Sequence, residues 1–171
     1  MANAYLGLGT NLGNRRKLLF ATIKHLSEKA GTISAVSDFY ETAPWGYLSP
    51  HPYLNAAVQL DTLLSPHELL TVTQQIESEL GRTTKSKDCQ YADRTIDIDM
   101  LLYDERILQA PDLVLPHPLL HQRLFVLQPL AEIASYILHP VLNKTIAALY
   151  HNLLSDTKGT LDMQNQDNLI K

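Results

Sequence analysis

The stretch that most constrains the fold is residues 94–103, with the sequence RTIDIDMLLY. It places two carboxylates, Asp97 and Asp99, two positions apart within an apolar run. Residues i and i+2 of a β-strand lie on the same face, with Cα atoms roughly 6–7 Å apart. The stretch therefore predicts a strand with a carboxylate face and an opposite core face, the latter formed by Ile96, Ile98, Met100 and Leu102.

Two carboxylates side by side on one strand repel each other and disfavour folding unless a cation lies between them. Mg²⁺ is the natural cation, because it takes hard oxygen ligands and often only one or two carboxylates. Arg94 adds a donor that suits phosphate. The alternative is a solvated edge strand, and the apolar neighbours together with Arg94 favour the cation site over it.

Length and composition indicate one domain and exclude several partners. The chain has 171 residues and a net charge of −4, which argues against binding nucleic acid through its phosphates. There is no apolar run of about 18 residues, so we expect no membrane span, and we expect no secretory signal. The single cysteine, Cys89, suits a reducing compartment, so we expect a cytoplasmic protein.

Hydrophobic periodicity predicts the order β-α-β-β-α-β followed by C-terminal helices. A capping box at Ser65 and Glu68, with Pro66 at the first helical position, marks one sharp helix start. The expected strands cover residues 4–9, 33–42, 53–61 and the stretch 94–103, with a short hairpin strand near 107–108; the expected helices cover 15–29, 65–80, 123–134 and 143–154.

This order predicts an α+β, ferredoxin-like βαββαβ fold: a four-stranded antiparallel sheet with helices packed on it, plus C-terminal helices. Pro129 is expected to shorten or kink the helix at 123–134. Residues 1–154 would form a single domain. Residues 155–171 are polar and aperiodic, so we expect a loosely held tail.

Three segments without a regular pattern flank the predicted site. Residues 7–14 are rich in glycine but do not match a P-loop, so a tight and mobile strand-to-helix turn is expected. Residues 43–53 hold three prolines, the only tryptophan and two tyrosines; they either fold back onto the core or cover a flat aromatic ligand. Residues 82–94 are polar and partly basic, which is typical of a solvated loop or of one that folds over an anion.

Four segments together resemble one family. They are YLGLGTNLG at 5–13, YLNAAV at 53–58, RTIDID at 94–99, and LPHP at 115–118 followed by RLFVL at 123–127. Their order and spacing are similar to those of the 6-hydroxymethyl-7,8-dihydropterin pyrophosphokinases of folate biosynthesis. The resemblance implies a ferredoxin-like enzyme with two Mg²⁺ ions. It also implies transfer of pyrophosphate from ATP to the hydroxymethyl group of the pterin, with release of AMP.

The resemblance also assigns roles by position. It makes Asp97 and Asp99 the metal ligands, and it counts them with Arg82 and Arg94 as the catalytic residues. It places the nucleotide against Leu70, Gln74, Glu77, Arg82, Arg94, Ile98, His117, Pro118 and Arg123. It places the pterin against Thr42, Ala43, Pro44, Trp45, Tyr53, Asn55, Tyr91 and Phe125, with Phe125 stacking on the ring.

Three positions depart from the family pattern, namely Thr84, Tyr91 and the pair Ala92–Asp93. No residue stands out as a general base; His117 is one candidate, and activation of the hydroxyl by metal is the simpler hypothesis. We expect a monomer. One alternative function is another Mg²⁺-dependent phosphoryl or nucleotidyl transferase, and the other is a non-catalytic ferredoxin-like binding module. The net charge of −4 and the acidic pair disfavour the module.

Overall fold

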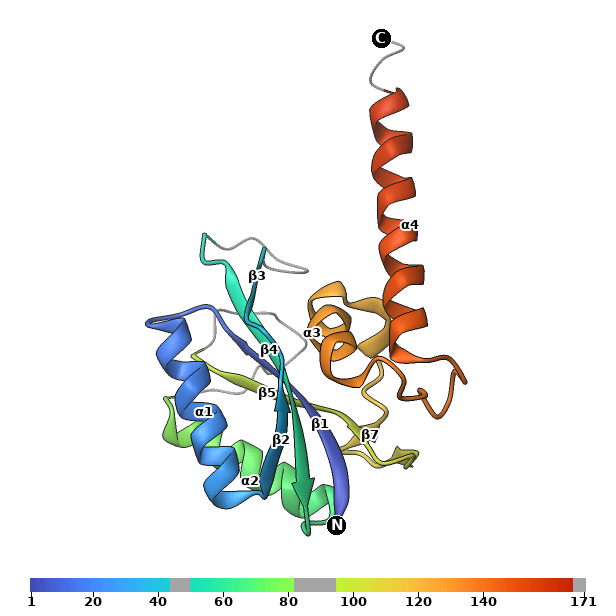
Figure 1. The fold of residues 1–171 in the computed structure, drawn as a ribbon. Helices are drawn as coiled ribbons and strands as arrows, with labels where there is room; N and C mark the ends of the chain where they lie inside the picture. Colours follow the sequence, from blue (N-terminus) through green and yellow to red (C-terminus); the bar gives the residue numbers. More distant parts are fainter. Residues whose placement is uncertain (44–49, 82–94, 168–171) are drawn as a thin grey trace.

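The computed structural model describes residues 1–43, 50–81 and 95–167. Its elements, in chain order, are β1 (Ala2–Thr10), α1 (Arg15–Lys29), β2 (Thr32–Val36), β3 (Tyr40–Thr42), β4 (Tyr53–Thr62), α2 (Pro66–Glu79), β5 (Asp97–Tyr103), β6 (Leu108–Gln109), β7 (Val114–Leu115), a 3-10 turn (Leu120–Gln122), α3 (Leu124–Ala134) and α4 (Ile146–Asp167). Figure 1 shows the central sheet with its helices. No described helix is long and apolar enough to cross a membrane.

The main sheet is antiparallel and has the strand order β2-β4-β1-β5, with β3 also paired to β4. The expected single strand over residues 33–42 is wrong, because the structure divides it into β2 and β3. Val36 pairs with Val58 and Tyr40 with Asn55, so three residues, 37–39, lie opposite two, 56–57. The extra residue forces the chain out of the ladder, and the Ser37 hydroxyl accepts the Ala57 N–H there (2.9 Å).

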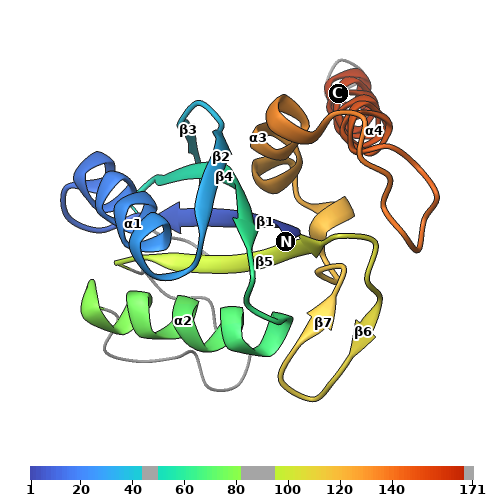
Figure 2. The ribbon, with the colours of Figure 1, turned by 60° about the horizontal axis from the view of Figure 1, so that its bottom comes forward.

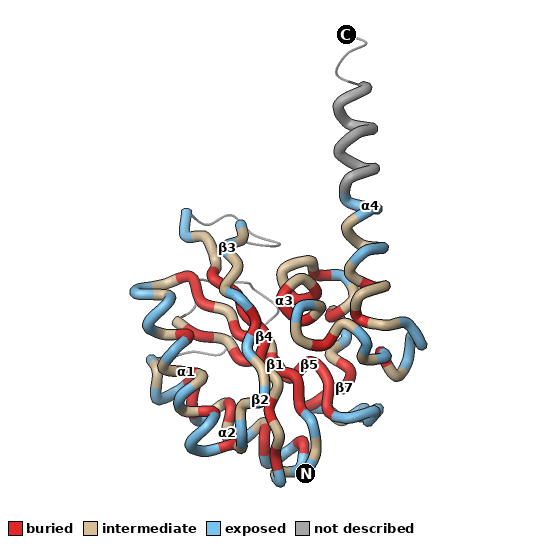
Figure 3. Tube along the Cα trace, viewed as in Figure 1, coloured by how far each residue is buried: buried red, intermediate tan, exposed pale blue. Residues whose placement is uncertain are grey.

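The two faces of the sheet bury different helices. Helices α1 and α2 cover one face, where Leu19, Leu26, Leu69 and Ile76 join the alternate β-strand side chains in one apolar cluster. Helix α3 covers the other face, with Leu127 and Leu130 in a second cluster, and the start of α4 packs against α3. Figure 2 shows α2 and α3 on opposite sides of the sheet, and Figure 3 shows the buried residues along the strands between them.

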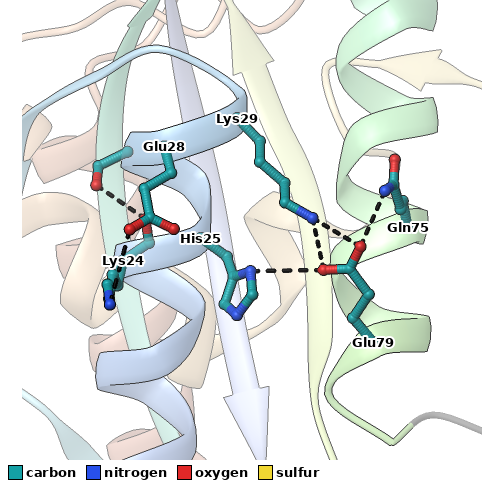
Figure 4. Close-up of polar contacts among 7 residues, drawn as sticks. Lys24, His25, Glu28, Lys29, Gln75 and Glu79 are labelled. Atoms are coloured by element: carbon teal, nitrogen blue, oxygen red, sulfur yellow. Dashed lines mark hydrogen bonds and ion pairs between the residues drawn. The ribbon is translucent and has the colours of Figure 1, made fainter.

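A polar cluster joins α1 to α2 at the surface of the first layer (Figure 4). Lys29 Nζ donates to both oxygens of Glu79 at 2.6 Å, and Gln75 Nε2 donates to Glu79 Oε1 at 2.9 Å. His25 Nδ1 lies 3.5 Å from Glu79 Oε2. The bond from Lys29, followed by the bond from Gln75, holds the pKa of Glu79 below its ordinary value. The cluster therefore ties the two helices together at the surface.

Strand β5 keeps the expected alternation over its first half only. Ile98 and Met100 point into the cluster beneath α1 and α2. The register then shifts, because Leu6 pairs with Met100 whereas Tyr5 pairs with Leu102, and Leu101 is left as the extra residue. Leu102 consequently lies in the cluster beneath α3, so its expected place on the face of Ile98 and Met100 is wrong.

The C-terminal third of the chain adds the β6–β7 hairpin, α3 and α4. Helix α3 runs without interruption through Pro129. Helix α4 continues past residue 154, where its end was expected, to Asp167. In Figure 1 it projects away from the sheet.

Candidate active site

A cavity of about 250 Å³ lies on the α3 side of the sheet. Its walls come from five elements that are far apart in the sequence: β1, β3, β4, β5 and the start of α3, together with the segment after β7. The lining residues are Gly7, Leu8, Gly9, Thr42, Ala43, Tyr53, Asn55, Ala56, Asp97, Asp99, His117, Arg123, Phe125 and Val126.

The floor of the cavity follows from the strand register. Gly9 of β1 pairs with Asn55 of β4 on one side and with Asp97 of β5 on the other. Gly7 and Asp99 form the next row. Glycine usually weakens a strand interior, and it is often found where another group approaches the backbone closely. A Cβ on Gly9 would lie only 3.2 Å from Asn55 Oδ1, so glycine keeps the space between amide and carboxylate open.

We call Asp97, Asp99, His117 and Arg123 the acidic end of the cavity. Asp97 and Asp99 are partly exposed on one face of β5, as the alternation predicts, whereas Ile98 between them is buried. The backbone N–H of His117 donates to Leu101 O at 2.9 Å, which joins the His117 segment to β5. Strand alternation and one backbone bond thus bring the carboxylates and the imidazole together.

His117 is held as a neutral imidazole in the wall of the cavity. Its Nδ1 accepts the Leu119 N–H at 3.2 Å, so the proton of the neutral ring is on Nε2. Burial lowers the pKa of His117 to about 4; the charge of Arg123 acts in the same direction, and Asp97 opposes it. At neutral pH the ring therefore has only an N–H to offer a ligand in the cavity.

Glu77 lies behind β5 and does not line the cavity. It is buried on α2, and its Oε1 accepts the backbone N–H of Ile98 at 2.8 Å. Ile98 is the residue between Asp97 and Asp99. The bond therefore fixes the β5 backbone at the position from which the two carboxylates project.

We call Thr42, Ala43, Tyr53, Asn55 and Phe125 the amide end. Asn55 is 5% exposed, and its Nδ2 donates to Thr42 Oγ1 at 2.7 Å. With the amide nitrogen turned toward Thr42, the amide oxygen lies on the Gly9 side. Phe125 adds an aromatic ring, with the Arg123 guanidinium 5.8 Å from its centroid. Such a slot suits a flat heterocycle with N–H groups along one edge.

The structure brings together nine of the residues assigned from the sequence: Thr42, Ala43, Tyr53, Asn55, Asp97, Asp99, His117, Arg123 and Phe125. Five others do not line the cavity: Leu70, Gln74, Glu77, Ile98 and Pro118. Five more lie outside the described residues: Pro44, Trp45, Arg82, Tyr91 and Arg94. Gly7 and Gly9 were expected at the end of the first strand and in the glycine-rich run after it, but not as part of the site; their two-residue spacing within that strand was the available signal.

The carboxylate pair fits a magnesium ion better than a closed metal cage. Within residues 1–43, 50–81 and 95–167 there is no group of three or more His, Cys, Asp or Glu side chains that could hold a metal. A structural zinc site needs four such ligands. Mg²⁺ is commonly held by one or two carboxylates, with water and substrate phosphates completing the shell. Asp97 and Asp99 supply such a set of oxygen donors.

The fold and the cavity together define a class of protein. A pair of carboxylates beside a buried arginine suits a phosphorylated nucleotide, and the adjoining amide and aromatic ring suit a flat acceptor. The class is therefore a phosphotransferase with two substrates.

Comparison with known proteins defines the family. Residues 5–135 match the family of 7,8-dihydro-6-hydroxymethylpterin-pyrophosphokinase, HPPK. The chain is 51% identical over 141 residues to the 2-amino-4-hydroxy-6-hydroxymethyldihydropteridine pyrophosphokinase of Porphyromonas gingivalis, covering 82% of this chain and 95% of that one. Identity to the Bacillus subtilis enzyme of the same name is 44% over 135 residues, covering 78% and 79%. The chain belongs to the HPPK family.

Solved structures show the same fold at low sequence identity. The wild-type HPPK-DHPS of Plasmodium falciparum with pteroate superposes with a TM-score of 0.75 at 20% identity, over 94% of this chain. An HPPK-DHPS in complex with substrates gives a TM-score of 0.72 at 16% identity. This chain spans 44% of the length of each of these structures.

Proposed function

We propose that this chain transfers the pyrophosphoryl group of ATP to the hydroxymethyl group of 6-hydroxymethyl-7,8-dihydropterin, giving AMP and the pterin diphosphate, in folate biosynthesis. The observation that carries the proposal is the cavity itself. It joins the acidic end to the amide end across a floor that contains Gly7 and Gly9. Membership of the HPPK family supports the same reaction and favours neither of the alternative functions.

The chemistry divides between the two ends of the cavity. The amide end holds the pterin, with Asn55 accepting from its N–H edge and Phe125 stacking on its ring. The acidic end holds the triphosphate, so that the pterin hydroxyl attacks the β-phosphorus and AMP leaves. Such a transfer depends on alignment and charge neutralisation more than on covalent chemistry. Arg123 and the N–H of His117 contribute donors to the phosphate oxygens.

Asp97 and Asp99 are the residues that would hold Mg²⁺, and we propose two ions. When bound, Mg²⁺ neutralises phosphate charge and makes the attacking hydroxyl more acidic. Arg82 and Arg94 are proposed to bind the triphosphate. Tyr91, from the same segment at 82–94, is proposed to contact the pterin. Leu70, Gln74, Ile98 and Pro118 are proposed for the adenosine, while Thr42, Ala43, Pro44, Trp45 and Tyr53 complete the pterin side.

We also propose the fold topology, oligomeric state, localisation and domain bounds of the chain. The strand order, with β2 and β3 taken as one interrupted strand, supports a ferredoxin-like βαββαβ arrangement. We further propose a cytoplasmic monomer that binds neither nucleic acid nor membrane. Residues 1–154 would be its single pyrophosphokinase domain, followed by a loosely held polar tail at 155–171.

The product of the reaction tests the proposed function. The protein is incubated with ATP, Mg²⁺ and the hydroxymethyl dihydropterin, and the nucleotides are separated. We expect AMP in a one-to-one ratio with the pterin diphosphate. The control replaces the hydroxymethyl group with a methyl group and should give no AMP. Formation of ADP or of free pyrophosphate would instead indicate a different transferase.

A further inference from the structure

The two walls of the amide end belong to elements that are joined only weakly. Phe125 and Val126 lie at the start of α3, whereas Thr42 and Ala43 lie at the end of β3. Strand β3 has three residues, and among the described strands it pairs with β4 alone. Backbone pairing fixes β3 against β4, and α3 also packs on β4. A side-chain contact between β3 and α3 would hold the two elements together directly.

Glu132 of α3 makes this contact. Its Oε1 and Oε2 accept the backbone N–H of Asp38 at 3.1 and 3.0 Å, and its Oε2 also accepts the hydroxyl of Tyr40 at 2.9 Å. Both carboxylate oxygens are therefore bonded to the chain that enters and begins β3. Burial and the Glu132 carboxylate raise the pKa of Tyr40, which keeps its hydroxyl a donor at neutral pH.

The geometry of the two elements connects this contact to the cavity. Glu132 follows Phe125 by seven residues, about two helical turns, so both lie on the same face of α3. Tyr40 and Thr42 are two residues apart in β3, so they lie on the same strand face. The Tyr40–Glu132 pair thus closes one end of the gap between β3 and α3, and Thr42 and Phe125 border the cavity at the other end.

We propose that Glu132 is a positioning residue, which sets the width of the amide end by holding β3 against α3. The inference rests on the proposed function for the identity of the ligand. Thr42 in turn accepts the Asn55 amide, so a displacement of β3 also turns the amide that faces the Gly9 side of the cavity. Glu132 acts through Thr42 and Asn55 and does not itself line the cavity.

The contact is separable from folding. Glu132 is exposed at the surface, and it belongs to neither apolar cluster of the described residues. The segment between β2 and β3 has its own anchor, because Ser37 donates its backbone N–H to Ala57 O and accepts the Ala57 N–H on its hydroxyl, both at 2.9 Å. Removal of the carboxylate therefore leaves the sheet intact and frees only the position of β3 relative to α3.

The test compares ligand affinities in Glu132→Ala, Tyr40→Phe and the double variant. The dissociation constants of the hydroxymethyl dihydropterin and of a non-hydrolysable ATP analogue are measured with Mg²⁺ present, together with the melting temperature. We expect Glu132→Ala to weaken pterin binding by about tenfold and Tyr40→Phe by about threefold, which is the range that one or two bonds to a charged acceptor can supply. Affinity for the ATP analogue should stay within about twofold.

Three further comparisons sharpen the test. The double variant should bind pterin no more weakly than Glu132→Ala, since the Tyr40 hydroxyl acts through that carboxylate. Glu132→Gln keeps one acceptor oxygen, so it should recover part of the lost affinity. The matched control is Glu28→Ala on α1, an exposed helical glutamate paired with Lys24 at 3.7 Å (Figure 4), which should leave both affinities unchanged.

Unchanged pterin affinity in Glu132→Ala would overturn the inference. A parallel loss of both affinities with a lower melting temperature would also overturn it, because it would indicate a general structural role. If the wild-type protein binds pterin and the variants match it, only the role of Glu132 fails. If the wild-type protein does not bind pterin, the proposed function fails and the role of Glu132 fails with it.

Discussion

The two ends of the cavity are built in different ways. At the acidic end, Asp97 and Asp99 stand on a single strand, and one backbone bond adds the His117 segment. At the amide end, Thr42, Asn55 and Phe125 come from three elements, β3, β4 and α3, and a side-chain bond joins Thr42 to Asn55. Substitutions at the acidic end should therefore change chemistry without changing shape, whereas substitutions at the amide end should change shape and affinity.

The largest effect is expected at the carboxylate pair. Asp97→Asn or Asp99→Asn keeps the side-chain volume but removes a charged oxygen donor from the site of phosphate transfer. We expect kcat to fall by about a thousandfold or more, while the melting temperature and the affinity for pterin without nucleotide stay close to wild type. Turnover assays at millimolar Mg²⁺, thermal unfolding and pterin titration measure the three quantities.

A matched carboxylate outside the cavity serves as the control for that experiment. Asp112 has a side chain that is 62% exposed, and its Oδ1 lies 3.5 Å from His67 Nε2. Asp112→Asn should leave kcat unchanged. Full activity of both cavity variants would contradict the assignment of Asp97 and Asp99. Loss of pterin affinity in those variants would show that the two ends are not separable.

A smaller effect is expected on the glycine floor, where the two ends meet. In Gly9→Ala the new Cβ lies 3.2 Å from Asn55 Oδ1, and Asn55 cannot withdraw easily because it is buried and bonded to Thr42. We expect pterin affinity to fall by about tenfold, as overpacking of a fixed site costs on the order of 1–3 kcal/mol. Isothermal titration with pterin, and separately with an ATP analogue, measures the effect.

Gly7→Ala provides the comparison on the same strand. Its new Cβ would lie 3.4 Å from the Cδ atoms of Leu101, which is an ordinary van der Waals contact. Pterin affinity should therefore change by less than about threefold, because the methyl group overpacks nothing. Equal losses in the two variants would mean that strand flexibility, rather than the space beside Asn55, governs binding.

The same contrast explains how much the sequence could predict. The faces of β5 around Asp97 and Asp99, and the bounds of α1 and α2, follow from local periodicity and caps, and the structure confirms them. The break at 37–39 and the shift at Leu101 depend on how neighbouring strands pair, which no local pattern reveals. Gly7 and Gly9 gave no sign of a floor, because only their strand partners show which groups lie beside them.

The residues that shape the amide end are not visible in any local sequence pattern. Asn55 alone reads as an ordinary polar strand residue, and its role appears only when Thr42 fixes the amide and Gly9 leaves room beside it. Glu132 gave no signal in the sequence, because its partners Asp38 and Tyr40 are more than ninety residues away. Residues whose function depends on a tertiary contact between short elements are those that periodicity does not identify.

The smallest effect is expected in the pH dependence of stability, and it too should separate the two ends. The pKa of His117 is lowered to about 4 from its ordinary 6.5, so between these values the unfolded chain binds more protons than the folded protein. The stabilisation is complete above the ordinary pKa and is lost as the pH falls toward 4. From pH 7 to pH 5 the free energy of unfolding should fall by about 1–2 kcal/mol more in wild type than in His117→Gln.

Urea denaturation at a series of pH values measures this difference, with a chelator present so that no divalent cation binds near the imidazole. The matched substitution at the amide end is Tyr53→Phe, which removes no group that titrates between pH 5 and 7. Its free energy of unfolding should therefore change with pH as steeply as that of wild type. Equal slopes in wild type and His117→Gln would show that the imidazole is not held neutral by burial and by Arg123. The acidic end would then lack the neutral donor that the Leu119 N–H bond to Nδ1 implies.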